Sequence, residues 1–379
     1  FQKTIDNIDE LNRQKTELEK IIEDLKAKPD DSSYREKQQE CEDEIRGVDR
    51  IITSIERNNT FNYLSDEGIL PNYAFPESGV TLHTILKSDR NEDGIDGADK
   101  GSSSKTERRE VASRDFVRPA ASAITELAPG NTFYANGHKY AVNRVLFAKG
   151  DRGQEASMWR LCPNCSHAEP ASQAENLASC PSCGSTQWAD NGQKRPMIRI
   201  STVMSEERYS ESQIDDSSDN RSSAQFVKDT LVDVSSSDVE AAWRVKKGVD
   251  FGFEYIPQGT IREINFGEAG TDGTEIEVAG DKRVRKGFNV CTSCGALANE
   301  QGYIRHAYSC ARRNETTESA EGSTCLFLYR EVRSAILRMH VPGIAYASGN
   351  NGAAQSFAAA VMLGLRKKFG NVDHPNVTL

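Results

Sequence analysis

The sequence has no long apolar run. None of its hydrophobic stretches approaches the roughly 20 residues that a membrane-spanning helix needs, so we predict no membrane partner. No signal-peptide pattern opens the chain, and most of its 9 cysteines stand in spacings typical of metal ligands rather than of disulfide pairs. These absences predict a cytoplasmic protein whose thiols stay reduced. Because the first residue is Phe1 rather than Met, we also expect a piece of a longer protein.

The sequence also lacks the motifs of a self-contained enzyme. It has no G-x-x-x-x-G-K-S/T loop for a nucleoside triphosphate and no G-x-S-x-G elbow for a nucleophilic serine. No Ser/His/Asp set can be assembled either, because several histidines stand alone, namely His83, His138, His340 and His374. We therefore predict no catalytic residue in this chain.

Positive charge is scarce overall but gathers near the C-terminus. The net charge of −10 argues against nucleic acid, yet residues 281–379 carry 13 Lys/Arg against 7 Asp/Glu, so the first 280 residues hold −16. A basic cluster that could grip DNA phosphates consists of Lys282, Arg283, Arg285, Lys286, Arg312 and Arg313. The alternative is an ordinary solvated face.

Two Cys/His sets stand out against this background. The first pairs two CxxC turns fourteen residues apart, with ligands Cys162, Cys165, Cys180 and Cys183. Two such turns can complete the tetrahedron that Zn²⁺ prefers; two disulfides are the alternative. The second set is Cys291, Cys294, His306 and Cys310, in which Cys325 could replace His306. The basic cluster is close in sequence to these ligands, so we expect the metal of this set to gather its residues in space. Four protein ligands leave no open position for water, so both predicted zinc ions are structural. Cys41, on a polar helical stretch, is interpreted as a bystander.

Hydrophobic periodicity predicts an α+β multidomain fold. Residues 1–60 form a helical coiled-coil hairpin broken near Pro29, and 61–107 form an ordered connector (64–76) and a flexible loop (88–106). Residues 108–280 form a β-rich domain with a zinc ribbon at 159–188, and 281–379 form a C-terminal α/β zinc-binding domain.

Finer features of these two domains follow from local signals. The Asn136-Gly137 pair predicts a hairpin turn, and a short helix is expected within 109–127. Predicted strands cover 197–203, 243–255, 260–266 and 326–341; a flexible acidic loop covers 205–223, and a helix covers 351–369.

Several segments resemble a known family. They are LSDEGILPNYAFPESGVTL (64–82), REVASRDFVRPAASAITELAPGNTFYANGHKYAVNRV (109–145), FNVCTSCGALANEQGYIRHAYSC (288–310), FLYREVRSAILRMHVP (327–342) and SFAAAVMLGLRKKFG (356–370). This set resembles the region after the motor in large DEAD/DEAH-box superfamily-two helicases, including the Mrf-type repair helicase and the antiphage helicases of DISARM and Druantia systems. The likeness covers about two-thirds of the chain and departs from the family in the helical hairpin and at 205–223.

The resemblance implies a motor that binds ATP and Mg²⁺ outside this chain, with DNA and other defence-system subunits as partners. It also implies that the C-terminal domain is truncated here, and that Cys291, Cys294, His306 and Cys310 form a structural zinc site. Two other functions stay open: a zinc-ribbon scaffold that recruits a defence or repair partner, and a standalone zinc-ribbon nucleic-acid-binding factor.

Overall fold

The computed structural model describes residues 2–27, 32–57, 79–87, 112–146, 156–173, 177–214, 224–246, 248, 251–271, 273–315, 317, 322–341 and 351–370. The fold is α+β, and no helix in these ranges is long and apolar enough to cross a membrane. Two compact units appear: unit 1 is Phe1–Asp229 with Glu263–Arg330, and unit 2 is Thr230–Arg262 with Glu331–Leu379. The domains predicted above divide the chain serially, whereas each unit combines two separate segments.

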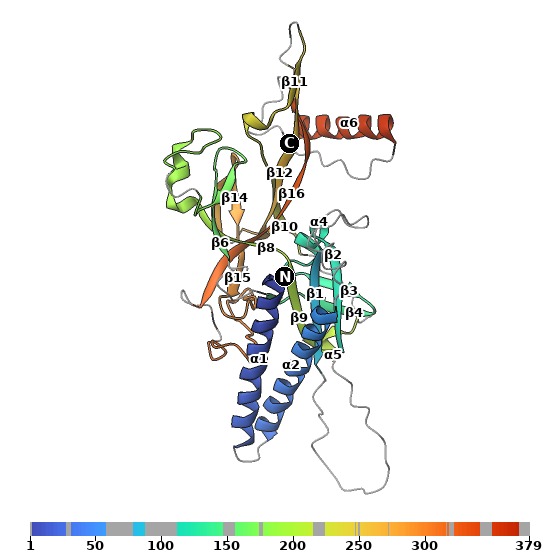
Figure 1. The fold of residues 1–379 in the computed structure, drawn as a ribbon, viewed down its shortest axis with the longest axis vertical. Helices are drawn as coiled ribbons and strands as arrows, with labels where there is room; N and C mark the ends of the chain where they lie inside the picture. The colour runs from blue at the N-terminus through green and yellow to red at the C-terminus, as the bar shows by residue number, and fades with distance from the viewer. Residues whose placement is uncertain are drawn as a thin grey trace. The chain divides into compact units, whose positions relative to one another are not determined.

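Unit 1 begins with the predicted helical hairpin. Helices α1 (Gln2–Lys26) and α2 (Ser32–Arg57) run antiparallel and side by side (Figure 1). Apolar residues at helical spacing, such as Leu11 and Leu18, are buried between the helices and their neighbours. The Lys15 ammonium lies 2.8 Å from Asp49, which joins the two helices at their polar edge. The hairpin is therefore amphipathic, as its sequence pattern predicts; the expected break lies largely outside the described residues.

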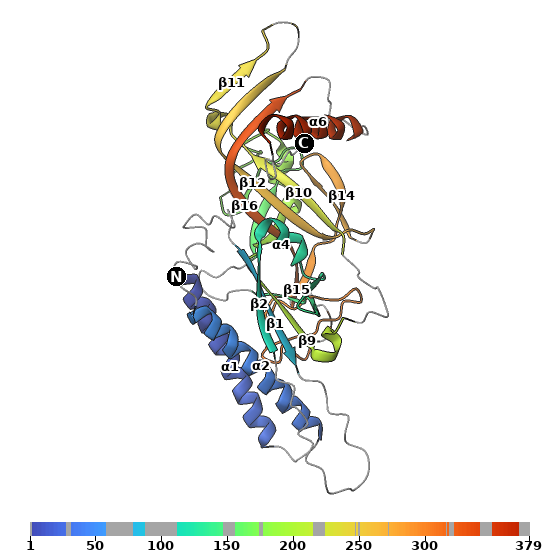
Figure 2. The ribbon, with the colours of Figure 1, turned by 90° about the vertical axis from the view of Figure 1, so that its right-hand side faces the viewer.

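The hairpin packs on a four-stranded sheet (Figure 2). Strand β1 (Gly79–Lys87) pairs antiparallel with β2 (Ala112–Pro119) and parallel with β9 (Thr202–Arg208), which pairs in turn with β5 (Arg144–Val145). Apolar side chains bury this contact from both sides, namely Leu11, Val48, Ile51 and Ile52 from the helices and Ile85 and Met204 from the sheet. We call these six residues the apolar anchor.

A small hairpin and a short helix close the core of unit 1. Strands β3 (Thr132–Ala135) and β4 (His138–Ala141) are joined by Asn136 and Gly137 at φ values of 51° and 78°. Both angles are positive, as a type I′ turn requires, which confirms the predicted turn. The short helix expected within 109–127 is confirmed as α4 (Ala120–Glu126), and residues 112–119 before it extend to pair with β1 as β2.

A second, larger sheet has the strand order β10-β12-β16-β8-β6-β7. Its strands are β6 (Ser157–Leu161), β7 (Ala168–Pro170), β8 (Lys194–Arg199), β10 (Phe226–Asp233), β12 (Gly252–Glu268) and β16 (Ser323–His340). Strand β15 (Phe288–Cys291) pairs with the start of β16, and β13 (Thr274–Val278) and β14 (Asp281–Arg285) form a separate hairpin. Strands β10, β12 and β16 contribute residues to both units.

Unit 2 corrects one predicted strand and confirms a predicted helix. The stretch 243–255 is not one strand: β11 (Ala241–Arg244) turns back onto β12, with Trp243 opposite Phe253. Helix α6 (Asn351–Phe369) is present. Its partly buried positions include the predicted apolar face, Ala358, Val361, Met362 and Leu365.

The predicted loops have mixed outcomes. Residues 205–208 continue β9 and residues Tyr209–Ser212 form the short helix α5, so the first part of the 205–223 loop is ordered structure. Glu206 and Glu207 are drawn into β9 because strand pairing with β1 extends to Arg208. The predicted connector at 64–76 and the loop at 88–106 lie outside the described residues.

Candidate metal centres

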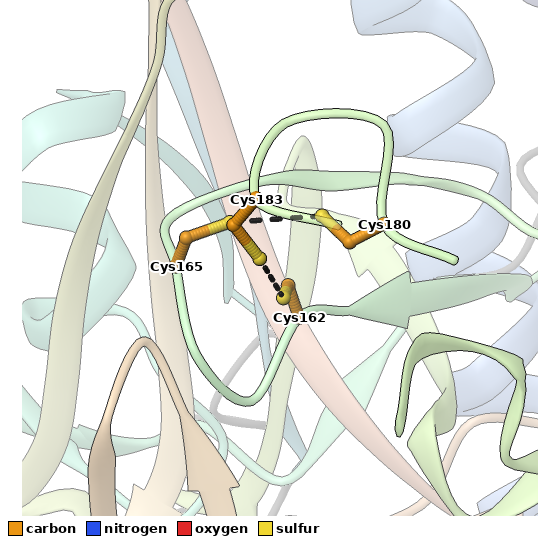
Figure 3. A group of neighbouring side chains, drawn as sticks. All are labelled: Cys162, Cys165, Cys180 and Cys183. Carbon is orange, nitrogen blue, oxygen red and sulfur yellow. Dashed lines mark hydrogen bonds between the residues drawn. The ribbon is translucent and has the colours of Figure 1, made fainter. Parts of the chain in front are cut away.

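The first cysteine set closes into a compact site, here called site 1. Cys162 and Cys165 lie on one turn after β6, and Cys180 and Cys183 lie on a second turn that faces it (Figure 3). The sulfurs of Cys162 and Cys183 are 3.6 Å apart, and those of Cys165 and Cys180 are 3.7 Å apart. A tetrahedron with Zn–S bonds of about 2.3 Å places its sulfurs roughly 3.8 Å apart. The predicted quartet therefore has the spacing of a zinc site.

Backbone geometry explains why the second turn folds this way. Gly184 follows Cys183 at φ 74°, a value that side chains disfavour, and its N–H donates to the carbonyl of Cys180 at 2.8 Å. In the first turn the Cys162 N–H donates to the His167 carbonyl at 3.0 Å. These bonds bend each CxxC segment so that both sulfurs point inward.

Site 1 is held by an aromatic side chain and a cation. Trp188 is fully buried against Cys162 and Cys180, and its ring centroid lies 5.2 Å from that of His167. The Arg160 guanidinium, from β6, donates to the Trp188 carbonyl at 2.6 Å. Burial raises the pKa of the Cys162 thiol to about 11, so metal binding at neutral pH releases its proton.

The second set forms site 2 and settles which residue is the fourth ligand. His306 Nδ1 lies 3.4 Å from Cys294 Sγ and 3.5 Å from Cys310 Sγ, and Cys291 Sγ lies 3.9 Å from Cys310 Sγ. Cys325 is exposed and its thiol donates to the Lys286 carbonyl, so it does not belong to the set. The predicted Cys₃His group is therefore the one that could hold an ion.

Site 2 contains preformed support for thiolates. The N–H groups of Ser293 and Arg312 donate to Cys291 Sγ at 3.3 Å and Cys310 Sγ at 3.4 Å. Hydrogen bonds from Cys294 and Cys310 lower the pKa of Cys291, which favours one thiolate before a metal arrives. Gly295, at φ 69°, repeats the role of Gly184, since its N–H donates to the Cys291 carbonyl at 2.9 Å.

Both sites offer four protein ligands and no open coordination position, which suits structural zinc rather than hydrolysis. Metal-bound histidines usually donate their second ring N–H to an oxygen. In the described part of the chain the buried Nε2 of His306 has no such partner.

A buried charge network beside site 2 was not predicted from the sequence. Glu206 on β9 pairs with Lys87 on β1 and with Arg144 on β5, whose Nη2 lies 2.8 Å from Glu206 Oε2. Burial opposes ionisation of Glu206, but Lys87 and Arg144 outweigh it and lower its pKa to about 2. Glu44 on α2 faces the same cluster, and burial together with Glu206 raises its pKa to about 7. The sequence signal was limited to Lys87 and Arg144, which are isolated charges beside apolar runs, because Glu206 lies in a polar stretch.

The predicted basic residues are less free than their sequence suggests. Lys282 pairs with Glu275 at 3.1 Å, Arg312 with Glu315 at 3.1 Å, and Arg283 with Asp281. The Arg285 side chain is fully buried and pairs with Asp229 at 2.6 Å. Arg285 is therefore placed to stabilise the β13–β14 hairpin rather than to meet a phosphate.

The spacing of the basic residues in the sequence suggested that they gather around one metal, but the structure divides them between the two sites. The turn between β13 and β14 donates from Ala279 to the Cys162 carbonyl at 3.0 Å, which attaches Lys282 and Arg283 to the site 1 side. Arg313 donates to the Tyr308 carbonyl at 3.3 Å, so it belongs to site 2. The basic residues are divided between the two sites because β14 pairs with β13, and this pairing cannot be read from distances along the sequence.

No protein-family model, curated protein or solved structure matches this chain.

Proposed function

We propose that this chain is the non-motor part of an ATP-dependent DNA helicase or translocase, acting in antiphage defence, and that it engages DNA with exposed cations near two structural zinc ions. The observation that carries the proposal is that segment 288–310, one of the five on which the helicase resemblance rests, contains four potential ligands that converge in site 2. ATP and Mg²⁺ belong to the motor. No residue of this chain is assigned a catalytic role.

The side chains available to DNA are fewer than the sequence cluster. The side chains of Lys282 and Arg283 are 62% and 47% exposed. Their partners Glu275 and Asp281 are also exposed, so DNA phosphates can compete with these carboxylates for the two cations. Lys286 and Arg313 complete this set with Arg312. Each cation that neutralises a phosphate releases counterions, which makes DNA affinity fall with salt.

The test is DNA binding by the 379-residue chain across a salt series. The triple variant Lys282→Gln/Arg283→Gln/Lys286→Gln should bind all DNA sequences more weakly, and its log–log salt slope should flatten by about one for each phosphate that is no longer neutralised. A matched control removes three exposed cations from α6, Arg366→Gln/Lys367→Gln/Lys368→Gln, with the same change of charge. Equal losses of affinity in both triples would mean that only net charge matters, and no loss in either would remove the DNA proposal.

A gain-of-binding variant sharpens the test. Glu275 holds Lys282, so Glu275→Gln should free that cation and raise DNA affinity. A fall in affinity, or no change, would count against contact at Lys282.

A protein-interaction scaffold is the second candidate, and two observations favour it. Lys282, Arg283 and Arg312 already have carboxylate partners. In unit 2, β11 exposes 56% of Trp243 and Val245 beside it is 50% exposed, apolar surface that suits a protein partner. If the triple variant binds DNA like the parent, while Trp243→Ser loses a defence-system partner in co-purification, the scaffold function replaces the DNA-binding one.

A further inference from the structure

Site 2 is clamped to the helical hairpin by the residues between two of its ligands. Tyr308 and Ser309 lie between His306 and Cys310. The Tyr308 N–H donates to Glu44 Oε2 and the Ser309 hydroxyl donates to Glu44 Oε1, both at 3.2 Å. Both oxygens of one buried carboxylate on α2 are thus held by the metal-binding turn.

The Tyr308 side chain extends the same contact along α2. Its hydroxyl donates to Glu40, one helical turn before Glu44, and its ring packs against a buried cluster of Leu18, Ile22 and Cys41. The Lys87 ammonium lies 5.5 Å from the centre of the ring. Tyr308 therefore packs against the buried cluster that contains Cys41, whose exposed fraction is 0%. The thiol interpreted from sequence as a bystander thus belongs to the cluster on which the metal-binding turn rests.

The turn has little structure of its own. Residues 305–307 form no strand, and the local backbone bond in this segment runs from the Cys310 N–H to the Ala307 carbonyl at 3.0 Å. A short segment with a ligand at each end is fixed mainly by the ion, because structural zinc supplies folding free energy that the apo segment lacks. The positions of Tyr308 and Ser309 thus depend on the metal.

The rest of the hairpin is attached differently. The apolar anchor joins α1 and the later turns of α2 to β1 and β9 and uses no residue of site 2. Within it Gly47 allows close approach, since a Cβ at that position would lie 2.5 Å from Ile85 Cδ1. The two attachments therefore use different segments of α2, and Arg208 of β9 adds an ion pair to Glu40 at 3.2 Å.

We propose that the ion of site 2 fixes one half of the helical hairpin to the rest of unit 1, and we call this metal-dependent contact the lock. With the ion bound, the 306–310 turn holds the α2 segment from Glu40 to Glu44 and seals Cys41. Loss of the ion frees that half of the hairpin while the apolar anchor keeps the other half in place. Metal occupancy at site 2 thereby sets how firmly the helical hairpin is attached to the rest of unit 1.

Cys41 reports the state of the lock. Zinc-loaded wild type, Cys310→Ser and Cys162→Ser are alkylated with iodoacetamide, and modification of the Cys41 peptide is followed by mass spectrometry. Cys310→Ser should speed Cys41 alkylation by roughly ten-fold or more, the opening expected when a charge-assisted hydrogen bond is lost. Cys162→Ser, which empties site 1, should leave the Cys41 rate unchanged. Equal rates in all three proteins would overturn the proposal.

A second variant leaves every ligand in place. Glu44→Gln replaces one of the two carboxyl oxygens that accept from Tyr308 and Ser309 with an NH₂ group, and it should speed Cys41 alkylation while metal analysis still finds two zinc ions per chain. Unchanged Cys41 protection in Glu44→Gln would show that the bonds from Tyr308 and Ser309 to Glu44 do not hold the helical hairpin.

Two further measurements keep the proposal decisive if Cys310→Ser does not fold. Wild type is titrated with a chelator, and Cys41 should become reactive together with Cys291 and Cys294, not with the site 1 cysteines. Hydrogen exchange at residues 48–52 should stay slow throughout. Reaction of Cys41 before the site 2 cysteines, or fast exchange at 48–52, would contradict a lock on one half of the hairpin.

Discussion

Sites 1 and 2 share their ligand number and knuckle geometry but differ in what they hold together. Site 1 contacts an aromatic ring and backbone groups: Trp188 packs against Cys162 and Cys180, the Arg160 guanidinium donates to the Trp188 carbonyl, and the turn after β13 caps the Cys162 carbonyl. Site 2 lies against strand β5 and against a buried carboxyl group of helix α2. Residues 295–297 exchange backbone bonds with Asn143 and Val145, and Tyr308 and Ser309 bind Glu44. Site 1 closes a ribbon, whereas site 2 joins a sheet to a helix.

The contrast shows that ligand spacing encodes the metal but not the role of the metal. Both quartets follow from CxxC turns with a glycine after the second cysteine, which are local features. Whether an ion supports one loop or a junction depends on segments more than 100 residues away, such as α2 for site 2.

The largest expected effect comes from removing each ion in turn. Structural zinc contributes on the order of 10 kcal/mol to the segment that it folds. Cys310→Ser should lower the thermal unfolding midpoint of unit 1 much more than Cys162→Ser, because site 2 also supports α2 through Tyr308 and Ser309 and β5 through residues 295–297. Circular dichroism melts, with metal analysis showing one remaining zinc ion per chain in each variant, measure this. Equal midpoints would erase the distinction between the sites.

The next effect separates the buried ion pairs beside site 2 from the bonds between Arg160 and backbone carbonyls beside site 1. Glu206→Gln leaves Lys87 and Arg144 buried without their carboxylate, which should cost about 3–5 kcal/mol of unfolding free energy. Arg160→Met beside site 1 removes bonds to two carbonyls and should cost about 1–3 kcal/mol. Urea unfolding of both variants gives the comparison, and a larger loss of stability for Arg160→Met would reverse it.

Local sequence signals predicted the parts of both sites that are built locally. The eight ligands, the Asn136-Gly137 turn, the long strand that became β16 and helix α6 all follow from spacing or periodicity within one segment. The α+β class and the helical hairpin follow for the same reason.

Features that depend on pairing between strands far apart in the sequence could not be predicted. Strand β1 lies parallel to β9 although about 120 residues separate them, and this pairing orders Glu206 and Glu207 in a stretch whose polar composition indicates a loop. The basic residues were assigned to one metal because they are close in sequence, but the β13–β14 hairpin carries Lys282 and Arg283 to the other. Polar residues are ordered here by partners, which composition does not show.

A smaller effect of pH should arise at Glu207 on β9, which interacts electrostatically with Arg305, the residue before His306 of site 2. Burial raises the pKa of Glu207 to about 7, against lowering by the Ala141 N–H, Lys139 and Arg305. A raised carboxyl pKa means that the folded state holds a proton which the unfolded state has released, so stability falls as pH rises from 4.5 through 7.

Glu207→Gln should remove the part of this decline that Glu207 causes, while the part that Glu44 causes remains. Relative to wild type, it should gain about 1–2 kcal/mol at about pH 8, less than a fully buried carboxyl would give, and nothing at about pH 4.5. Urea unfolding at both pH values measures the difference. Parallel pH profiles for the two proteins would show that Glu207 does not titrate in this window.

The smallest effect tests whether the two knuckles are equivalent once their surroundings are set aside. Gly184 and Gly295 have φ values of 74° and 69°, and each N–H donates to the carbonyl of the first cysteine in its CxxC pair. Alanine in this left-handed conformation costs about 1–2 kcal/mol whatever space surrounds it. Around Gly184 there is also open space, because a Cβ there would meet nothing within 4 Å. Gly184→Ala should therefore weaken zinc binding at site 1 by roughly ten-fold, the backbone strain alone, and Gly295→Ala should weaken site 2 by a similar factor. Competition with a chromophoric chelator measures both affinities. A much larger decrease in affinity for Gly295→Ala would mean that the attachment of site 2 to β5 reaches into the knuckle itself, so that even its local geometry depends on the junction it supports.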